Sequence, residues 1–325
     1  MPTIKMIVTV AMLISATVLA AAQDWPTRPV TMVVTFAAGG ANDLVARILA
    51  PRMSEILGQQ VIIENVAGAG GMTGAVRVAK APPDGYQFMI GGPGQFAYNQ
   101  TLYKRPLYNS TTDFTPIGLA VEGPFVLITR KDLPASHLQD FISYAKENQR
   151  KMQFGSGGAG SGGHLTCVLL NSVIGANVTH VPYRSGGPAM QDLQGGRIDY
   201  MCDVISAALP QIEGKAVKAI ATLALGRTPV LPDLPTADEQ GLTNFEAPAW
   251  FAFVLPKGTP DTIVRRLNKV MGDALDTSAV RERLRDLGLS AVPSERRTPE
   301  YLAKFIPSEI EKWAGPIKAS GVSMD

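Results

Sequence analysis

Residues 30–58 read VTMVVTFAAGGANDLVARILAPRMSEILG and determine the fold class. The run 30–36 is apolar or β-branched throughout, which predicts a strand buried on both faces. Two glycines then make a sharp turn, and Asn42 or Asp43 can cap the helix that follows. Apolar residues recur at helical spacing in this helix until Gly58 ends it. A buried strand, a glycine turn and a helix are typical of an α/β sheet with parallel strands.

The same plan of strand, glycine turn and helix occurs twice along the chain. After the opening unit, strands at 61–64 and 86–90 complete a βαβαβ order, which predicts a parallel sheet with helices on both faces. A second unit begins with a strand at 152–155 and continues to strands at 178–181 and 198–204. The sequence therefore predicts an α/β protein of two lobes, each a mainly parallel sheet with flanking helices.

The chain is predicted to cross between the lobes twice. Strand-like runs at 117–119 and 125–129 bracket Glu122-Gly123-Pro124, which we interpret as an interdomain crossing. A later strand at 250–255 and two C-terminal helices are predicted to return to the first lobe. The predicted division is residues 23–123 and 251–325 for lobe 1, which is discontinuous, and residues 124–250 for lobe 2.

The N-terminal segment and the composition restrict the class of protein to which the chain can belong. Residues 1–22 carry one cation, Lys5, then an apolar run that closes on three alanines, which predicts a cleaved signal peptide. Removing this segment takes the formal charge from +2 to +1, because Lys5 is its only charge. A nearly neutral surface argues against nucleic acid or anionic membrane as the partner. With 46% hydrophobic residues, the 325-residue chain can fill two cores.

The two cysteines, Cys167 and Cys202, have no CxxC partner and no nearby histidine cluster. This pattern predicts neither a metal site nor a cofactor. An exported protein meets oxidising conditions, but a disulfide also requires a close Cα approach. The sequence leaves the pairing of the two cysteines open.

Glycine-rich turns are the candidate ligand-binding elements, because backbone N–H groups without Cβ atoms can converge on a carboxylate. Helix N-termini add unpaired N–H groups and a positive dipole end. Arg184 can bind a carboxylate in bidentate fashion or lie exposed on its loop, and His164 can line the cleft or serve as a cap. Asp203 can hold a water, hydroxyl or ammonium, or cap a helix. The candidate ligand-binding residues are Phe36, Ala38, Gly39, Gly40, Gly92 and Gln95 on lobe 1, and Ser156, Gly157, Ser161, His164, Tyr183, Arg184 and Asp203 on lobe 2.

The motifs argue against two rival functions, dinucleotide binding and hydrolysis by a serine nucleophile. Residues 155–160 match GxGxxG, but the acidic residue expected about 20 positions later for a ribose is missing, which argues against a dinucleotide. Neither Ser156 nor Ser161 stands in GxSxG, so no hydrolase nucleophile is indicated. We predict that the chain is not an enzyme and has no catalytic residues.

Several short motifs together resemble the Bug family, the binding proteins of tripartite tricarboxylate transporters. The resemblance runs over nearly the whole mature chain. One departure is that Thr35 and Ala37 occupy positions where the family often has proline, so the rigidity of the first turn is less assured. The matching residues are Arg28-Pro29, Phe36-Ala37-Ala38-Gly39-Gly40, Leu57-Gly58-Gln59, Glu64-Asn65, Gly68-Ala69-Gly70-Gly71, Pro83-Asp84-Gly85-Tyr86, Val181-Pro182-Tyr183-Arg184, Gly186-Gly187-Pro188-Ala189, Gly195-Gly196-Arg197-Ile198-Asp199, Leu231-Pro232-Asp233-Leu234-Pro235-Thr236 and Gly258-Thr259-Pro260.

The resemblance implies a two-lobed type II periplasmic-binding-protein fold that closes on a small dicarboxylate, tricarboxylate or aromatic acid by a hinge motion. It implies a periplasmic location and, as partners, the large and small integral-membrane permease subunits. We expect a monomer that binds no nucleic acid. The alternative is a ligand-sensing co-receptor for a two-component system. The resemblance leaves the identity of the ligand open.

Overall fold

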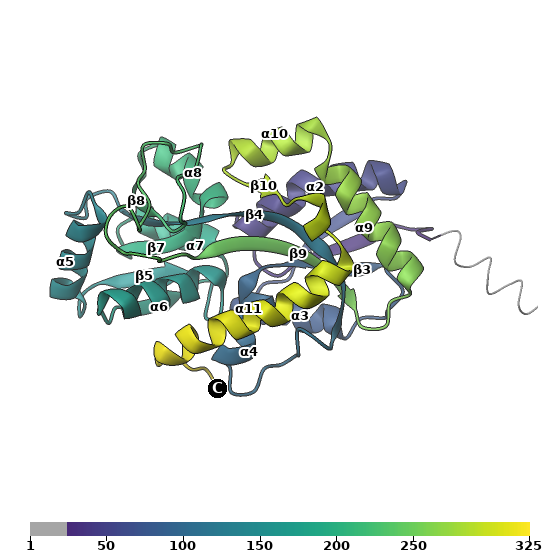
Figure 1. Cartoon of the computed structure of the whole chain (residues 1–325), viewed down its shortest axis with the longest axis horizontal. Helices are drawn as coiled ribbons and strands as arrows, with labels where there is room; N and C mark the ends of the chain where they lie inside the picture. The colour runs from purple at the N-terminus through teal and green to yellow at the C-terminus, as the bar shows by residue number, and fades with distance from the viewer. Residues whose placement is uncertain (1–24) are drawn as a thin grey trace, which may run out of the picture.

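The computed structural model describes residues 25–325, which form two α/β lobes side by side (Figure 1). The predicted signal peptide, residues 1–22, lies outside the described residues. No helix within residues 25–325 is both long enough and apolar enough to cross a membrane.

Lobe 1 is built on three parallel strands in the order β2-β1-β3. They are β1 (Val30–Val34), β2 (Val61–Asn65) and β3 (Gln87–Gly91). Every residue of β1 except Thr31 is buried, as the unbroken apolar run predicts. The connecting segments are α2 (Ala41–Leu57), η1 (Ala69–Gly71) and α3 (Met72–Ala79), which confirms the βαβαβ order.

Lobe 2 repeats this plan with parallel strands in the order β6-β5-β7. A further strand, β8, pairs antiparallel with β4 at the side of this sheet. The strands are β5 (Gln153–Ser156), β6 (Thr179–Pro182), β7 (Tyr200–Val204) and β8 (Val217–Thr222), and the helices are α5 (Leu138–Asn148), α6 (Gly162–Ile174), α7 (Gly186–Gln194) and α8 (Ile205–Glu213).

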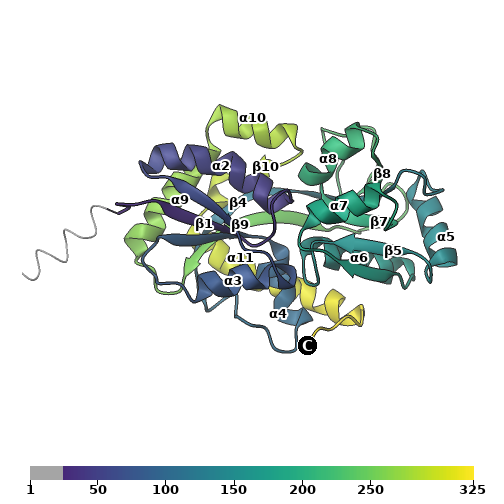
Figure 2. The same cartoon turned by 180° about the vertical axis from the view of Figure 1, so that it is seen from behind.

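Two long strands, β4 (Phe114–Arg130) and β9 (Pro248–Pro256), run antiparallel between the lobes (Figures 1 and 2). The sequence predicted two strands separated at residues 122–124, and this was wrong: β4 is continuous. Gly123 pairs with Ala249 and Pro124 with Pro248, so the segment stays extended against β9. Because β4 and β9 run antiparallel to the strands they pair with, the sheet of each lobe is mixed, with parallel strands beside antiparallel ones. The predicted division into residues 23–123 with 251–325 and 124–250 cuts β4 and β9, and we retain it as a proposal.

The C-terminal segment packs on lobe 1. Helix α9 (Asp261–Leu275) contacts α2, and the short β10 (Ser290–Ala291) pairs with β4. The sequence analysis did not predict α10 (Ser278–Asp286), which is rich in charged residues and carries only two buried ones. The last helix, α11 (Pro299–Ala319), lies beneath β4 and contacts both η2 (Gly94–Tyr98) and α4 (Asn99–Leu102).

Cys167 of α6 and Cys202 of β7 form a disulfide, with their Cα atoms 5.6 Å apart. Both residues are buried. The bond therefore ties α6 to β7 within lobe 2. This settles the pairing that the sequence left open.

Candidate ligand-binding site

A cavity of about 70 Å³ lies between the lobes, at the carboxyl ends of their parallel strands. Its walls come from the turns after β1, β3 and β5, from the end of β7 and from β9. Ligands of open α/β sheets bind at this end of the strands, where helices begin with unpaired N–H groups. One water needs roughly 10–15 Å³ of such space, so the cavity suits a small organic molecule.

The turn after β1 brings Phe36 and Gly40 to the cavity wall. Asn65 braces this turn, because its Nδ2 donates to the Phe36 carbonyl oxygen at 2.9 Å and to Asp43 Oδ1 at 3.0 Å. The Gly39 N–H donates to Asp43 Oδ2 at 3.0 Å. The neighbouring side chains therefore hold the turn in place although it lacks the prolines frequent in the Bug family.

Helix α2 begins two or three residues earlier than a cap at Asn42 or Asp43 would require. Its N-cap is Gly40, and no side chain caps it. Gly40 lies close to lobe 2, because a Cβ built on it would be 3.8 Å from the Gly186 nitrogen and from the Ser185 Cβ. The first N–H groups of α2 therefore face the cavity without a side-chain acceptor.

The turn after β3 contributes Gly92 and Gln95. Gln95 is buried, and both ends of its amide are engaged: Oε1 accepts from the Gly92 N–H at 3.0 Å, and Nε2 donates to the Gly70 carbonyl oxygen at 2.8 Å. Gln95 thus joins this turn to η1 and fixes the shape of the lobe 1 wall.

The turn after β5 presents Ser156, Gly157 and Ser161 to the cavity. The Ser156 hydroxyl lies 2.7 Å from His180 Nε2 and accepts from the Gly158 N–H at 3.1 Å. Ser161 is the N-cap of α6, where its hydroxyl accepts from the backbone N–H three residues later. The serines therefore shape the turn, and the first N–H groups of α6 point at the cavity.

His164 does not line the cavity. Its ring lies 4.1 Å from that of His180, and both rings stack near Phe154. Its Nδ1 accepts from the Gly160 N–H at 3.1 Å, so the imidazole supports the glycine turn from behind. Burial lowers the pKa of His164 to about 3 and that of His180 to about 4, so both rings are neutral at ordinary pH.

Four other predicted residues also lie off the cavity wall. The Tyr183 hydroxyl donates to Asp192 at 2.7 Å, which turns the ring away from the cavity. Arg184 is exposed, and only its carbonyl oxygen reaches lobe 1, where it accepts from the Ala37 N–H at 3.5 Å. Ala38 and Gly39 face α7 at the rim of the cavity. The backbones of Ala38, Gly39 and Arg184 contact the opposite lobe, whereas the Tyr183 side chain is hydrogen-bonded within lobe 2.

Asp203, at the end of β7, lines the cavity and is about nine-tenths buried. Its Oδ1 accepts from the Val204 N–H at 2.9 Å, whereas Oδ2 has no hydrogen-bond partner. Burial raises the pKa of this carboxyl to about 7, and the Val204 hydrogen bond offsets part of the increase.

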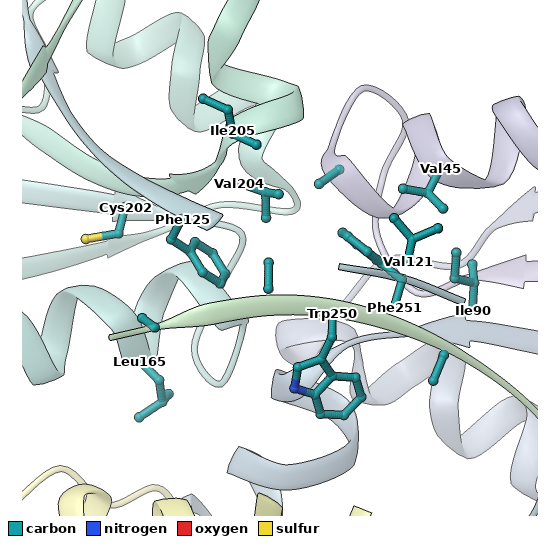
Figure 3. Close-up of a cluster of buried hydrophobic side chains, with 14 of the residues drawn as sticks. Val45, Ile90, Val121, Phe125, Leu165, Cys202, Val204, Ile205, Trp250 and Phe251 are labelled. Carbon is teal, nitrogen blue, oxygen red and sulfur yellow. The ribbon is translucent and has the colours of Figure 1, made fainter. Parts of the chain in front are cut away.

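Sequence reasoning missed several wall residues. Asn42, in the first turn of α2, lines the cavity with an unpartnered Nδ2. Phe125 of β4 was missed as well, whereas Trp250 of β9 could, from the sequence, either flank the ligand or lie in the core. Both add apolar wall, and Figure 3 shows Trp250 and Phe251 on opposite faces of β9. Trp250 is fixed by its indole N–H, which donates to the buried Glu309 at 3.1 Å. The predicted crossing at residues 122–124 directly precedes Phe125 and is the sequence signal that could have indicated it.

Backbone, and no basic side chain, makes the cavity favourable to anions. Among its lining residues, all within the described part of the chain, there is no lysine or arginine, and Asp203 is the one titratable side chain. Helices α2, α6, α7 and α8 all begin at this wall, so four positive dipole ends converge there. Within residues 25–325, no group of three or more His, Cys, Asp or Glu side chains is placed to hold a metal ion.

Two α/β lobes joined by crossing strands and closed over a cavity at their strand ends define a solute-binding protein of type II fold. The family model described as "Tripartite tricarboxylate transporter family receptor" matches residues 45–322. The chain belongs to this receptor family, TctC, which includes the Bug proteins.

Relatives and solved structures agree with this assignment. The chain is 42% identical to the UPF0065 protein of the TAR-I ttuE-ttuC' intergenic region of Agrobacterium vitis, covering 96% of this chain and 91% of that one. It superposes on the periplasmic binding protein BugD with a TM-score of 0.90 at 40% identity, covering 93% and 100% of the two chains. It also resembles MatC from Rhodopseudomonas palustris with bound malate, with a TM-score of 0.88, 41% identity and coverage of 90% and 100%.

Proposed function

We propose that the chain is a periplasmic receptor that captures a small carboxylate, namely a dicarboxylate, tricarboxylate or aromatic acid, and delivers it to the permease subunits of a tripartite tricarboxylate transporter. The observation that carries this proposal is the convergence of four helix N-termini on one small cavity whose described walls contain no basic side chain. Solved relatives hold such acids: MatC holds malate and the R. palustris protein Rpa4515 holds adipate.

The residues we assign to the ligand are the predicted ones that line the cavity. Backbone N–H groups at the starts of α2 and α6 bind carboxylate oxygens, and the aromatic faces of Phe36 and Trp250 pack on the carbon chain. The assigned residues are Phe36, Gly40, Gly92, Gln95, Ser156, Gly157, Ser161 and Asp203, joined by Asn42, Gly162 and Gly163.

Contacts between glycine turns support a closed state. A Cβ on Gly94 of lobe 1 would meet the Gly160 carbonyl oxygen of lobe 2. A Cβ on Gly70, also of lobe 1, would overlap the Ala159 carbonyl oxygen of lobe 2. Such close backbone approach across the cleft is possible only for glycine. We infer that these turns separate when the lobes open and admit the ligand.

We further propose that the chain does not act as an enzyme. The arrangement nearest to a catalytic dyad is Ser156 with His180, whose Nε2 lies 2.7 Å from the hydroxyl. A base with a pKa of about 4 is too weak to activate a serine efficiently at neutral pH. Incubation with the bound acid should therefore return that acid unchanged, as judged by chromatography.

A thermal-shift screen tests the carboxylate assignment. Mature protein, unfolded and refolded to remove carried ligand, is mixed with succinate, L-malate, adipate, citrate and terephthalate. A ligand at 100 times its Kd adds about 2.7 kcal/mol, or roughly 4 °C in Tm for a chain of about 300 residues. Succinamide, which has the length of succinate and no charge, is the matched control. A screen in which every acid matched this control would refute the proposal.

A further inference from the structure

Two buried polar atoms in the cavity wall lack partners, and they come from opposite lobes. One is Nδ2 of Asn42, a donor in the first turn of α2 on lobe 1. The other is Oδ2 of Asp203, an acceptor at the end of β7 on lobe 2. A buried polar group without a hydrogen bond is costly, so each requires a partner from the contents of the cavity.

The surroundings of Asp203 favour its use as an acceptor. Its Oδ1 already accepts from the Val204 N–H, where α8 begins. Oδ2 lies against the start of α7, since a Cβ on Gly186 would come within 3.1 Å of it. Two helix N-termini therefore flank the carboxyl, and both favour its ionised form.

The carboxylates of the ligand have their own partners elsewhere in the cavity, namely the free N–H groups at the starts of α2 and α6. They do not need Asp203. An acid with carboxylates alone would leave Oδ2 facing a second anion, which is unfavourable in a buried site.

Resting on the proposed function, we propose that the bound acid carries a hydrogen-bond donor, a hydroxyl or ammonium group beside its carboxylates, that donates to Asp203 Oδ2. Asn42 Nδ2 donates to an oxygen of the same ligand from the opposite lobe. Asp203 is thus the residue that separates hydroxy or amino acids from plain dicarboxylates of the same length.

The shifted titration of Asp203 agrees with this role. Burial raises its pKa to about 7, the Val204 hydrogen bond offsets part of that increase, and no charged side chain contributes. At pH 8 the carboxyl is mainly ionised and can accept. A ligand group that donates a hydrogen bond to Oδ2 would lower this raised pKa.

Calorimetric titration at pH 8 with matched acids tests the proposal. The pairs are L-malate against succinate, L-aspartate against succinate, and citrate against tricarballylate, and each pair differs by one hydroxyl or ammonium group. We expect the wild type to bind the donor-bearing member of at least one pair roughly tenfold tighter or more, because hydrogen bonds to buried charged groups are strong. Asp203→Asn should reduce that ratio to about threefold or less. Asp192→Asn, which changes a carboxylate outside the cavity wall, should keep the ratio.

The outcomes separate this inference from the proposed function. If plain acids bind the wild type as tightly as their donor-bearing partners at pH 8, the inference is wrong and the receptor assignment stands. Retention of the full preference by Asp203→Asn would assign the donor to another residue and overturn the inference as well. If no acid binds, the proposed function fails and this inference with it. Should Asp203→Asn not fold, equal binding of both members of every pair by the wild type would still overturn the inference.

Discussion

Replacing Gly94 with alanine should weaken ligand binding by blocking closure of the lobes. The added Cβ would lie 2.5 Å from the Gly160 carbonyl oxygen and 3.1 Å from the Gly162 nitrogen, both backbone atoms of lobe 2. Ordinary contact begins near 3.4 Å, so the turn must retreat by about 0.9 Å. The φ angle of Gly94 is outside the left-handed region, so alanine adds no backbone strain within lobe 1.

The expected magnitude follows from the cost of overpacking, about 1–3 kcal/mol, which applies only to the closed state. The affinity should therefore fall by roughly 5- to 150-fold. Calorimetry with the tightest acid of the panel measures this loss. Gly272→Ala on α9, where a Cβ meets nothing within 4 Å, is the matched control and should leave the Kd unchanged.

Because Gly94 also borders the cavity, small-angle scattering must distinguish blocked closure from a lost ligand contact. In the presence of saturating ligand, the Gly94→Ala variant should keep a larger radius of gyration than the wild type. A variant that binds with the wild-type Kd and contracts like the wild type would refute the reasoning.

Three further predictions concern stability. The folded pKa of His180, about 4, lies below its unfolded value near 6.5, so its contribution is complete above pH 6.5 and lost as the pH falls toward 4, by up to about 3 kcal/mol. Asp203 has a raised pKa, so its contribution to the free energy of unfolding falls as the pH rises from 3.8 to about 7. Urea melts of the Asp203→Asn variant at several pH values should therefore isolate the histidine contribution to that free energy. Replacing Cys167 and Cys202 by serine should cost roughly 3–4 kcal/mol for a 35-residue separation, and dithiothreitol should lower the urea midpoint of the wild type alone. Glu309→Gln should cost about 1.5–3 kcal/mol in urea melts, because the buried carboxylate accepts from two indole N–H groups.

Local patterns predicted most of the secondary structure because each element satisfies its own sequence rules. Residues 30–34 of the run 30–36 form β1 in the centre of the parallel strands of lobe 1, and the two predicted C-terminal helices correspond to α9 and α11. The strand break predicted at residues 122–124 was wrong, and the reason for the error is that glycine and proline normally end a strand. Here they are tolerated because β9 pairs with them across both lobes.

The predicted ligand-binding residues line the cavity wall in part, and those that lie off it share one physical cause. Sequence indicates which turns stand at strand ends, and Gly40, Ser156 and Asp203, named on that ground, line the cavity. It does not indicate which side chain of a turn faces the partner lobe, and Tyr183 and Arg184 face away. Their orientation depends on contacts distant in sequence, such as the one between the Ala37 N–H and the Arg184 carbonyl oxygen.

The absence of basic side chains from the described cavity wall bears on how such a receptor can select its ligand. A buried arginine would bind many carboxylates strongly through its charge, with less dependence on the rest of the ligand. Helix N-termini supply weaker, directional partial charges, so the total affinity depends on how many N–H groups the ligand reaches at once. Selectivity then resides in the spacing of the glycine turns and in the few side chains with unpartnered atoms. Relatives that keep the turns and change Asn42 or Asp203 should therefore bind different acids within one closed fold.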